Sequence, residues 1–139
     1  MCGFGAEEFY VRSLLREFRS RISNAHQFAV QNRVLLLYAS NGVSIDISLS
    51  GLPFEEKMIE QASFFEFLPD YLLLTCSAED LIVLKAFADR DKDWIDIKGI
   101  ILRNKANINQ PYILEQLNPL CEAKETPGIL IRLNELFRI

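Results

Sequence analysis

The sequence predicts an α+β fold, in which a small mixed β-sheet is flanked by helices and followed by a helical C-terminal half. Two observations predict it. The β-rich runs 33–39 and 43–49 are separated by Ser40-Asn41-Gly42, and Asn-Gly between two such runs is a strong hairpin signal. From residue 77 to the end, apolar residues recur at helical spacing, and asparagines and prolines mark the helix boundaries.

The length of the chain, 139 residues, fits one domain that can bury a single core without disulfides. We therefore expect a single domain over residues 1–139. Within it, residues 1–76 would form a partial sheet core and residues 77–139 a helical part.

The predicted hairpin, residues 33–49, carries the first candidate site residue. Its second strand alternates apolar and polar residues, which places Asp46 in the middle of a polar face. Aspartate is uncommon in strands, whereas a strand holds a carboxylate rigidly enough for metal binding or catalysis. No pair of acidic residues stands on any other predicted strand, so Asp46 lacks the partners that a metal site would need.

The remaining elements follow from turn signals and apolar spacing. A third short strand is expected at 71–75, after Pro69. Ser77-Ala-Glu-Asp80 has the form of a capping box that opens a helix. The predicted helices cover residues 6–22, a shorter segment that ends at 31, and residues 54–65, 78–89, 92–105, 110–119 and 127–138.

The charge and the apolar runs exclude several classes of partner. The formal net charge of −4 and the pI near 5.0 argue against a broad grip on a nucleic-acid backbone, so we expect no DNA partner. The longest apolar runs, 34–37 and 71–74, are far too short to cross a bilayer, so we expect no membrane partner.

The cysteines indicate a reducing, cytoplasmic location. Cys2, Cys76 and Cys121 are far apart and odd in number, and His26 is the single histidine. This spacing favours neither a zinc site nor a disulfide framework.

The densest polar cluster spans residues 85–96. Asp93 and Asp96 share one helix face, and we expect Lys92 to pair with Asp96, four residues later. Lys85 stands in an apolar run, so we expect its stem to be buried and its ammonium group to reach a polar partner. The cluster has two interpretations: a salt-bridge network that joins two helices, or a site for an anion such as phosphate.

Other polar residues have a structural interpretation beside the functional one. His26 has no acid or nucleophile at motif spacing. The position of Cys76 before a helix could lower its thiol pKa, or the thiol is simply buried. Asp89-Arg90-Asp91 has the D-x-D form of a metal site but ends a helix, which favours paired or solvated acids. The basic flank of the first helix is either solvated or a phosphate or partner site; it consists of Arg12, Arg16, Arg19 and Arg21.

Three segments together resemble the nucleotidyltransferase superfamily, and within it the AbiEii-type toxin group. They are Val43-Ser-Ile-Asp46-Ile, Leu52-Pro-Phe-Glu-Glu56, and the stretch from Ser77 to Asp96 with its Glu-Asp-Leu and Arg-x-Lys-Asp-Trp-x-Asp motifs. The resemblance covers residues 28–138. It implies a small mixed sheet flanked by helices, in agreement with the fold expected from the residues.

The resemblance also implies roles for individual residues. In that family, carboxylates on neighbouring strands hold Mg²⁺, which aligns the phosphates of an NTP for attack by a hydroxyl. Asp46 matches the third acid, a catalytic base or metal ligand. The other matches are the phosphate-binding positions Lys85, Arg90 and Lys92 and the acidic pair Asp93 and Asp96, which would act in catalysis or orient the lysine.

The chain departs from the family in its first residues. The family's Gly-Ser turn and D-x-D precede the segment that corresponds to residues 1–30, and Gly3-Phe4-Gly5 is not followed by Thr-x-Asp-x-Asp. Asp46 alone provides too few hard oxygen ligands for two metals. We therefore expect the polypeptide to be inactive or nearly so by itself, with the missing strand lost or supplied by another chain.

Two functions follow from these observations. The first is a shortened nucleotidyltransferase-fold protein, related to enzymes that transfer a nucleoside monophosphate from an NTP to a hydroxyl of a protein, RNA or small molecule. The second is a non-catalytic interaction module that binds a protein partner such as an antitoxin, or a second copy of itself. An open sheet edge and an apolar face would favour such association.

Overall fold

The computed structural model describes residues 7–104 and 107–138, in two compact units, Met1–Glu60 and Gln61–Ile139. The predicted α+β class is confirmed, since each unit combines helices with a small antiparallel sheet. Cys2 and Gly3-Phe4-Gly5 lie outside the described residues.

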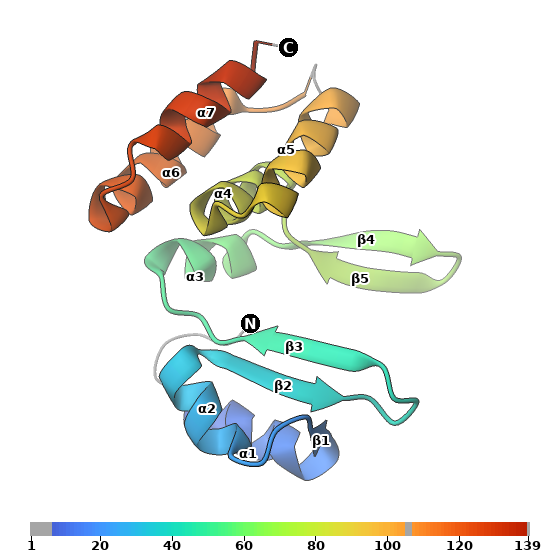
Figure 1. Ribbon diagram of the computed structural model, residues 1–139. Coiled ribbons are helices and arrows are strands. Elements are labelled where there is room, and N and C mark those ends of the chain that lie inside the picture. Colours follow the sequence, from blue (N-terminus) through green and yellow to red (C-terminus); the bar gives the residue numbers. More distant parts are fainter. Residues whose placement is uncertain (1–6, 105–106, 139) are drawn as a thin grey trace. The chain divides into compact units, whose positions relative to one another are not determined.

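The first unit places two helices beside a three-stranded sheet of order β1-β2-β3 (Figure 1). Its elements are α1 (Glu7–Glu17), β1 (Arg19–Ser20), α2 (Ala25–Asn32), β2 (Val34–Tyr38), β3 (Ser44–Ser48) and α3 (Pro53–Glu60).

The predicted hairpin is confirmed as β2 and β3, which pair from Val34↔Ser48 to Tyr38↔Ser44. Gly42 adopts φ 82°, a backbone conformation that glycine enters without steric cost. The Gly42 N–H donates to the carbonyl of Ala39 at 2.9 Å, which closes the turn.

The core of the first unit lies between its helices and its sheet. Leu35 and Leu37 are fully buried on one face of β2, as alternation predicts. On β3, Ile45 and Ile47 face this core and are partly buried, whereas Asp46 is exposed. The other buried residues of this core are Val11, Ala25, Ala29 and Leu49.

The predicted helix over residues 6–22 is too long. It ends at Glu17, and Arg19 and Ser20 instead pair with Tyr38 and Leu37 as strand β1. The Ser20 side chain accepts a hydrogen bond from the N–H of Ile22 at 3.1 Å. Serine side chains that bond to nearby backbone compete with helix formation, and sheet pairing adds to that competition.

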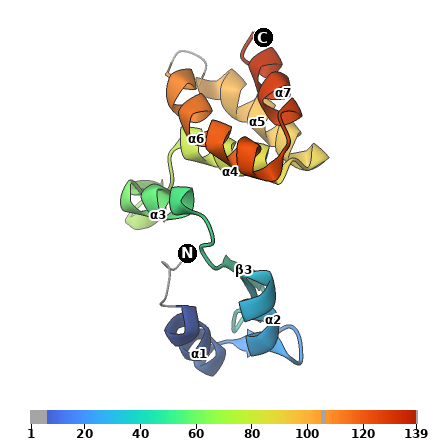
Figure 2. The ribbon, with the colours of Figure 1, turned by 90° about the vertical axis from the view of Figure 1, so that its left-hand side faces the viewer.

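The second unit packs α4 (Ala78–Ala88), α5 (Asp91–Asn104), α6 (Gln110–Lys124) and α7 (Gly128–Leu136) into a helical bundle (Figure 2). Each helix contributes an apolar face to one core. The buried residues of this core are Ile82, Val83, Ala86, Trp94, Ile97, Ile100, Ile101, Ile113, Leu117, Cys121, Ile129 and Leu133.

Two predictions are wrong in the region of strands β4 (Ser63–Leu68) and β5 (Tyr71–Thr75). The helix expected at 54–65 ends at Glu60, because Phe64, Phe65 and Phe67 favour an extended chain and form strand β4. Strand 71–75 does not join the hairpin of residues 33–49. It pairs with β4 in a separate sheet, so both sheets are antiparallel and the predicted mixed sheet is wrong.

The predicted helix boundary at Pro119 is also wrong, since α6 continues to Lys124. Proline removes one helical hydrogen bond. Here its ring lies on the exposed side, while Leu117 and Cys121 on either side of it are buried. The packing of those side chains outweighs the lost bond.

Across the described ranges, no helix is long and apolar enough to cross a membrane.

Candidate functional site

The candidate site lies where α4 meets α5, and it begins with the cap of α4. The predicted capping residue is confirmed: the Ser77 hydroxyl accepts a hydrogen bond from the N–H of Asp80 at 3.0 Å. Asp80 is buried, and its carboxylate accepts bonds from the hydroxyls of Ser77 at 2.7 Å and Tyr112 at 2.8 Å. Burial, followed by the bond to Asp80, raises the pKa of the Tyr112 hydroxyl. These bonds fix the start of α4 against α6.

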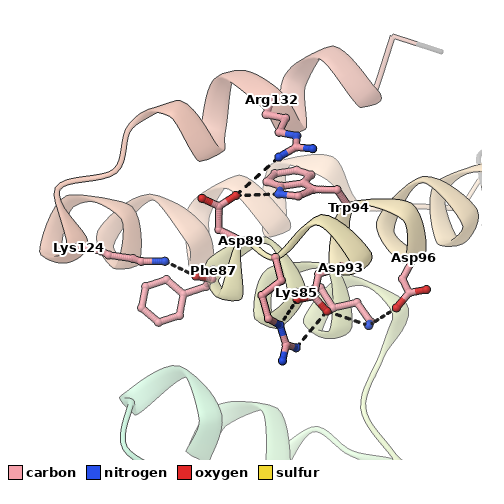
Figure 3. Close-up of polar contacts among 9 residues, drawn as sticks. Lys85, Phe87, Asp89, Asp93, Trp94, Asp96, Lys124 and Arg132 are labelled. Atoms are coloured by element: carbon pink, nitrogen blue, oxygen red, sulfur yellow. Dashed lines mark hydrogen bonds and ion pairs between the residues drawn. The ribbon is translucent and has the colours of Figure 1, made fainter.

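The turn between the two helices is fixed by Asp89. Its backbone is left-handed at φ 56°, and its N–H donates to the carbonyl of Lys85 at 3.1 Å. Its carboxylate accepts a hydrogen bond from the indole N–H of Trp94 at 2.7 Å. Arg132 of α7 stacks over the Trp94 ring with its guanidinium carbon 4.4 Å from the centroid (Figure 3). The D-x-D segment 89–91 therefore provides a paired acid, as its position at a helix end predicts.

Lys85 and Asp93 form the centre of the site (Figure 3). The Lys85 side chain is 22% exposed, and its ammonium lies 2.6 Å from Asp96 and 3.4 Å from Asp93. Arg90 forms a two-pronged contact with Asp93, with one N–H 3.2 Å from the same oxygen that Lys85 approaches. The predicted buried stem and polar partner of Lys85 are confirmed. The predicted pair of Lys92 with Asp96 is wrong: Lys92 is exposed, and Asp96 bonds to Lys85 instead.

The electrostatics of the cluster stabilise the charges of Asp93 and Lys85. The bonds to Arg90 and then to Lys85 hold the pKa of the Asp93 carboxyl below its ordinary value, although burial opposes this. The bond to Asp96 raises the pKa of the Lys85 ammonium. Both groups are therefore charged at neutral pH. The Asp93 side chain is only 1% exposed, so this is a buried carboxylate held by two cations.

Asp46 belongs to the first unit, and the other five predicted site residues belong to the second. Its side chain is 63% exposed and forms an ion pair with Arg21. The Arg21 N–H donates to the carbonyl of Leu36, and Leu36 is paired with Asp46 across β2 and β3. The sheet therefore brings Arg21 to Asp46. The sequence analysis did not predict this ion pair, because it extended the first helix to residue 22 and so placed Arg21 within that helix.

The described residues do not provide a complete magnesium site. Within residues 7–104 and 107–138, no three His, Cys, Asp or Glu side chains gather into a group that could hold a metal ion. Asp46 supplies one carboxylate, and Arg21 already engages it. Mg²⁺ prefers octahedral oxygen ligation, which one carboxylate alone does not define.

The other candidate residues have structural partners. His26 lies 2.8 Å from a carboxylate oxygen of Glu8. Burial raises the pKa of the Cys76 thiol, and the charge of Asp80 adds to this, so the helix N-terminus does not activate it. In the basic flank, Arg12 pairs with Glu8.

An open cavity of about 590 Å³ lies in the first unit and involves this flank. Arg19 stacks over Tyr38, with its guanidinium carbon 4.7 Å from the ring centroid. None of the six predicted site residues lines this cavity. Its lining residues are Glu17, Phe18, Arg19, Tyr38, Ala39, Ser40 and Gly42.

No protein-family model matches the chain, and no curated protein matches it either. The resemblance to nucleotidyltransferases therefore stays a prediction from the motifs.

Proposed function

We propose that this chain is related to nucleotidyltransferases and contributes a nucleotide-phosphate site around Lys85, at the junction of α4 and α5. One observation carries the proposal. The motif residues of the stretch from Ser77 to Asp96 converge, so that Lys85 and Arg90 approach the same oxygen of Asp93 at 3.4 and 3.2 Å. An ammonium and a guanidinium gathered on one carboxylate oxygen would both be available to donate to phosphate oxygens once a carboxylate gives way.

A phosphate would bind by exchange with Asp96. Asp93 is buried and held by Arg90, so it stays in place, whereas the Asp96 side chain is 54% exposed and can rotate away from Lys85. A nucleotide phosphate would then replace the Asp96 carboxylate on the ammonium group. Lys92 is exposed on the first turn of α5 and would supply a further charge.

The proposed reaction of the related enzymes is transfer of a nucleoside monophosphate from an NTP to a hydroxyl of a protein, RNA or small molecule. Mg²⁺ supplies the alignment of the phosphates in such reactions. In this chain Asp46 would be one ligand or base, and the other carboxylates would have to come from elsewhere. We therefore propose that the chain alone is inactive or nearly so, and that nucleotide binding is the property to measure.

The experiment measures the thermal stability of the chain with each NTP, with and without Mg²⁺. A nucleotide at about a hundred times its dissociation constant adds about 2.7 kcal/mol to the free energy of unfolding. This raises the melting temperature by several degrees. We expect this shift to vanish in Lys85→Ala and to persist in Lys98→Ala, an exposed lysine on α5 that serves as the matched control.

Asp96→Asn separates the two interpretations of the cluster. If Asp96 competes with phosphate, this variant should show a larger nucleotide-induced shift than the wild type, although its ligand-free stability is lower. If the cluster is only a structural network, no nucleotide shifts the melting temperature of either protein. The second result would contradict the proposal.

A second candidate function is a protein-interaction module, and a different observation favours it. The side chains of β4 and β5 include phenylalanines and leucines that are half to three-quarters exposed. Large exposed apolar patches mark interaction sites in soluble proteins.

A further inference from the structure

We infer that strand β5 associates with β5 of a second copy of this chain, so that two hairpins form one four-stranded antiparallel sheet. The inference rests on the second candidate function and names its partner. It does not depend on the nucleotide site, which lies on α4 and α5.

The first argument is the apolar surface of the hairpin. Its large apolar side chains are between 49% and 72% exposed; they are Phe64, Phe65, Phe67, Leu68, Tyr71, Leu72, Leu73 and Leu74. At about 200 Å² for each residue, this exposure amounts to roughly 1,000 Å², spread over both faces of the ribbon. A typical monomer has a largest apolar patch of about 300–600 Å². Pairing along β5 would make the apolar side chains of β5, Tyr71 to Leu74, cross-strand neighbours of their counterparts, and would extend the marginal two-stranded ribbon to four strands.

The second argument is that neither face of the hairpin is polar. Phe65 pairs with Leu73, and the next pair, Phe64 with Leu74, lies on the opposite face. In an antiparallel sheet with one face exposed to solvent, that exposed face is commonly polar. A two-stranded ribbon is also only marginally stable in water by itself. Among the described strands, β4 and β5 pair only with each other, and Figure 1 shows their ribbon reaching beyond the helices of this unit.

The third argument identifies β5 as the edge that pairs. Proteins protect exposed edges with charges, prolines and bulges. Strand β4 contains Glu66, has an irregularity in its pairing between Glu66 and Leu68, and is followed by Pro69. Strand β5 reads Tyr-Leu-Leu-Leu-Thr and has none of these protections. It is therefore the edge open to another strand.

The fourth argument favours a second copy as the occupant. An antiparallel pair of β5 strands centred on Leu73 is self-complementary, as a two-fold interface requires. Leu73 would face Leu73 of the second copy, Leu72 would face Leu74, and Tyr71 would face Thr75. The two Glu66 side chains would stand on the outer strands, three strand spacings or roughly 14 Å apart, so their charges do not oppose the pairing.

The first experiment measures the mass of the full chain in solution by sedimentation over a range of concentrations. We expect a discrete dimer for the wild type. Leu73→Lys should raise the dimer dissociation constant at least about tenfold, because it places two like charges opposite each other and removes two leucines from the interface. Ile95→Lys, at a residue of α5 that is 74% exposed, is the matched control and should leave the dimer unchanged.

The second experiment tests the register by disulfide formation, with Cys2 and Cys76 replaced by serine. Leu73→Cys places the same residue opposite itself in the two copies and should form a linked dimer under mild oxidation. Leu74→Cys faces Leu72 of the second copy and should link much more slowly. Circular dichroism of each variant verifies that its helices and strands are intact.

Three results would overturn the inference. One is a wild-type chain that is monomeric at every concentration, and another is a dimer that Leu73→Lys leaves intact. The third is a heterogeneous aggregate in place of a dimer. A monomer whose Leu73→Lys variant loses a complex with a different protein would overturn self-association and leave the interaction function standing. A nucleotide-induced shift would be unaffected by any of these results.

Discussion

The substitution Asp93→Asn tests whether the charged cluster is a main source of stability in the helical unit. Asp93 is the one member of the cluster whose side chain is almost fully buried, at 1% exposed, and it binds Arg90 and Lys85 together. Asparagine keeps the shape of the side chain and removes its charge. The substitution therefore isolates the electrostatic contribution.

The expected loss follows from the burial of the two partners. Removing one member of a buried ion pair costs about 3–5 kcal/mol, because the remaining charge is left without a partner. Here Arg90 is 61% exposed and can be solvated, and Lys85 keeps Asp96. We therefore expect a loss of about 2–3 kcal/mol. The matched control is Asp96→Asn, whose side chain is 54% exposed and whose pair should contribute below about 1 kcal/mol.

The assay uses Trp94, the single tryptophan of the chain, which is buried in the helical unit. Its fluorescence during urea unfolding reports on this unit by itself, so the first unit does not obscure the transition. The quantity compared is the free energy of unfolding extrapolated to water for the wild type and both variants.

The pH dependence gives an independent measure of the same group. Arg90 and Lys85 lower the native pKa of Asp93 below 3.8, its ordinary value. The charged form is therefore bound more tightly in the native state, and its stabilisation is complete above 3.8 and is lost as the pH falls through the native pKa. Asp93→Asn should thus be less stable than the wild type at pH 7, and the difference should shrink progressively as the pH falls below 3.8.

Two results would refute this reasoning. The first is a loss below about 0.5 kcal/mol in Asp93→Asn, since a buried carboxylate that binds two cations should contribute more than an exposed ion pair. The second is an equal loss in Asp96→Asn, which would show that burial does not decide the contribution.

Three further substitutions test other features of the fold. Ser77→Ala removes the cap of α4 and should cost about 1 kcal/mol in urea unfolding followed by Trp94. Gly42→Ala has free space around the new methyl group but a φ of 82°, so thermal unfolding followed by circular dichroism should show a loss of about 1 kcal/mol. Leu117→Ala should cost about 3 kcal/mol because the side chain is fully buried, whereas Leu102→Ala, 54% exposed, should cost less than about 1 kcal/mol in the same urea assay.

Local signals in the sequence were sufficient for several parts of the fold. The hairpin depends on Gly42 and its neighbours, and the start of α4 depends on Ser77, so both are fixed by a few adjacent residues. The buried stem of Lys85 followed from the apolar run around it. In each case the deciding interactions lie within one turn of helix or one strand pair, which is the range that spacing rules cover.

The errors arose where distant contacts decide the structure. Arg19 and Ser20 have helical spacing with the residues before them, but they pair with Tyr38 and Leu37. The aromatic run after Glu60 lacks the alternation that marks a half-buried strand, because both of its faces are apolar. The partner of Asp46 was missed for the same reason, since Arg21 reaches it only across β2.

The two proposals concern different elements and can therefore be tested in one chain. Lys85 lies on α4 and Leu73 on β5, and among the described residues the ion pairs of the Lys85 cluster do not involve the hairpin. Residues that share no partner contribute additively to stability and binding. If both proposals hold, the double variant Lys85→Ala with Leu73→Lys should lose the nucleotide-induced shift and the dimer together, and each single variant should lose only one. If Leu73→Lys also removed the nucleotide-induced shift, association would be a condition for nucleotide binding, and the site at α4 and α5 would not be sufficient by itself.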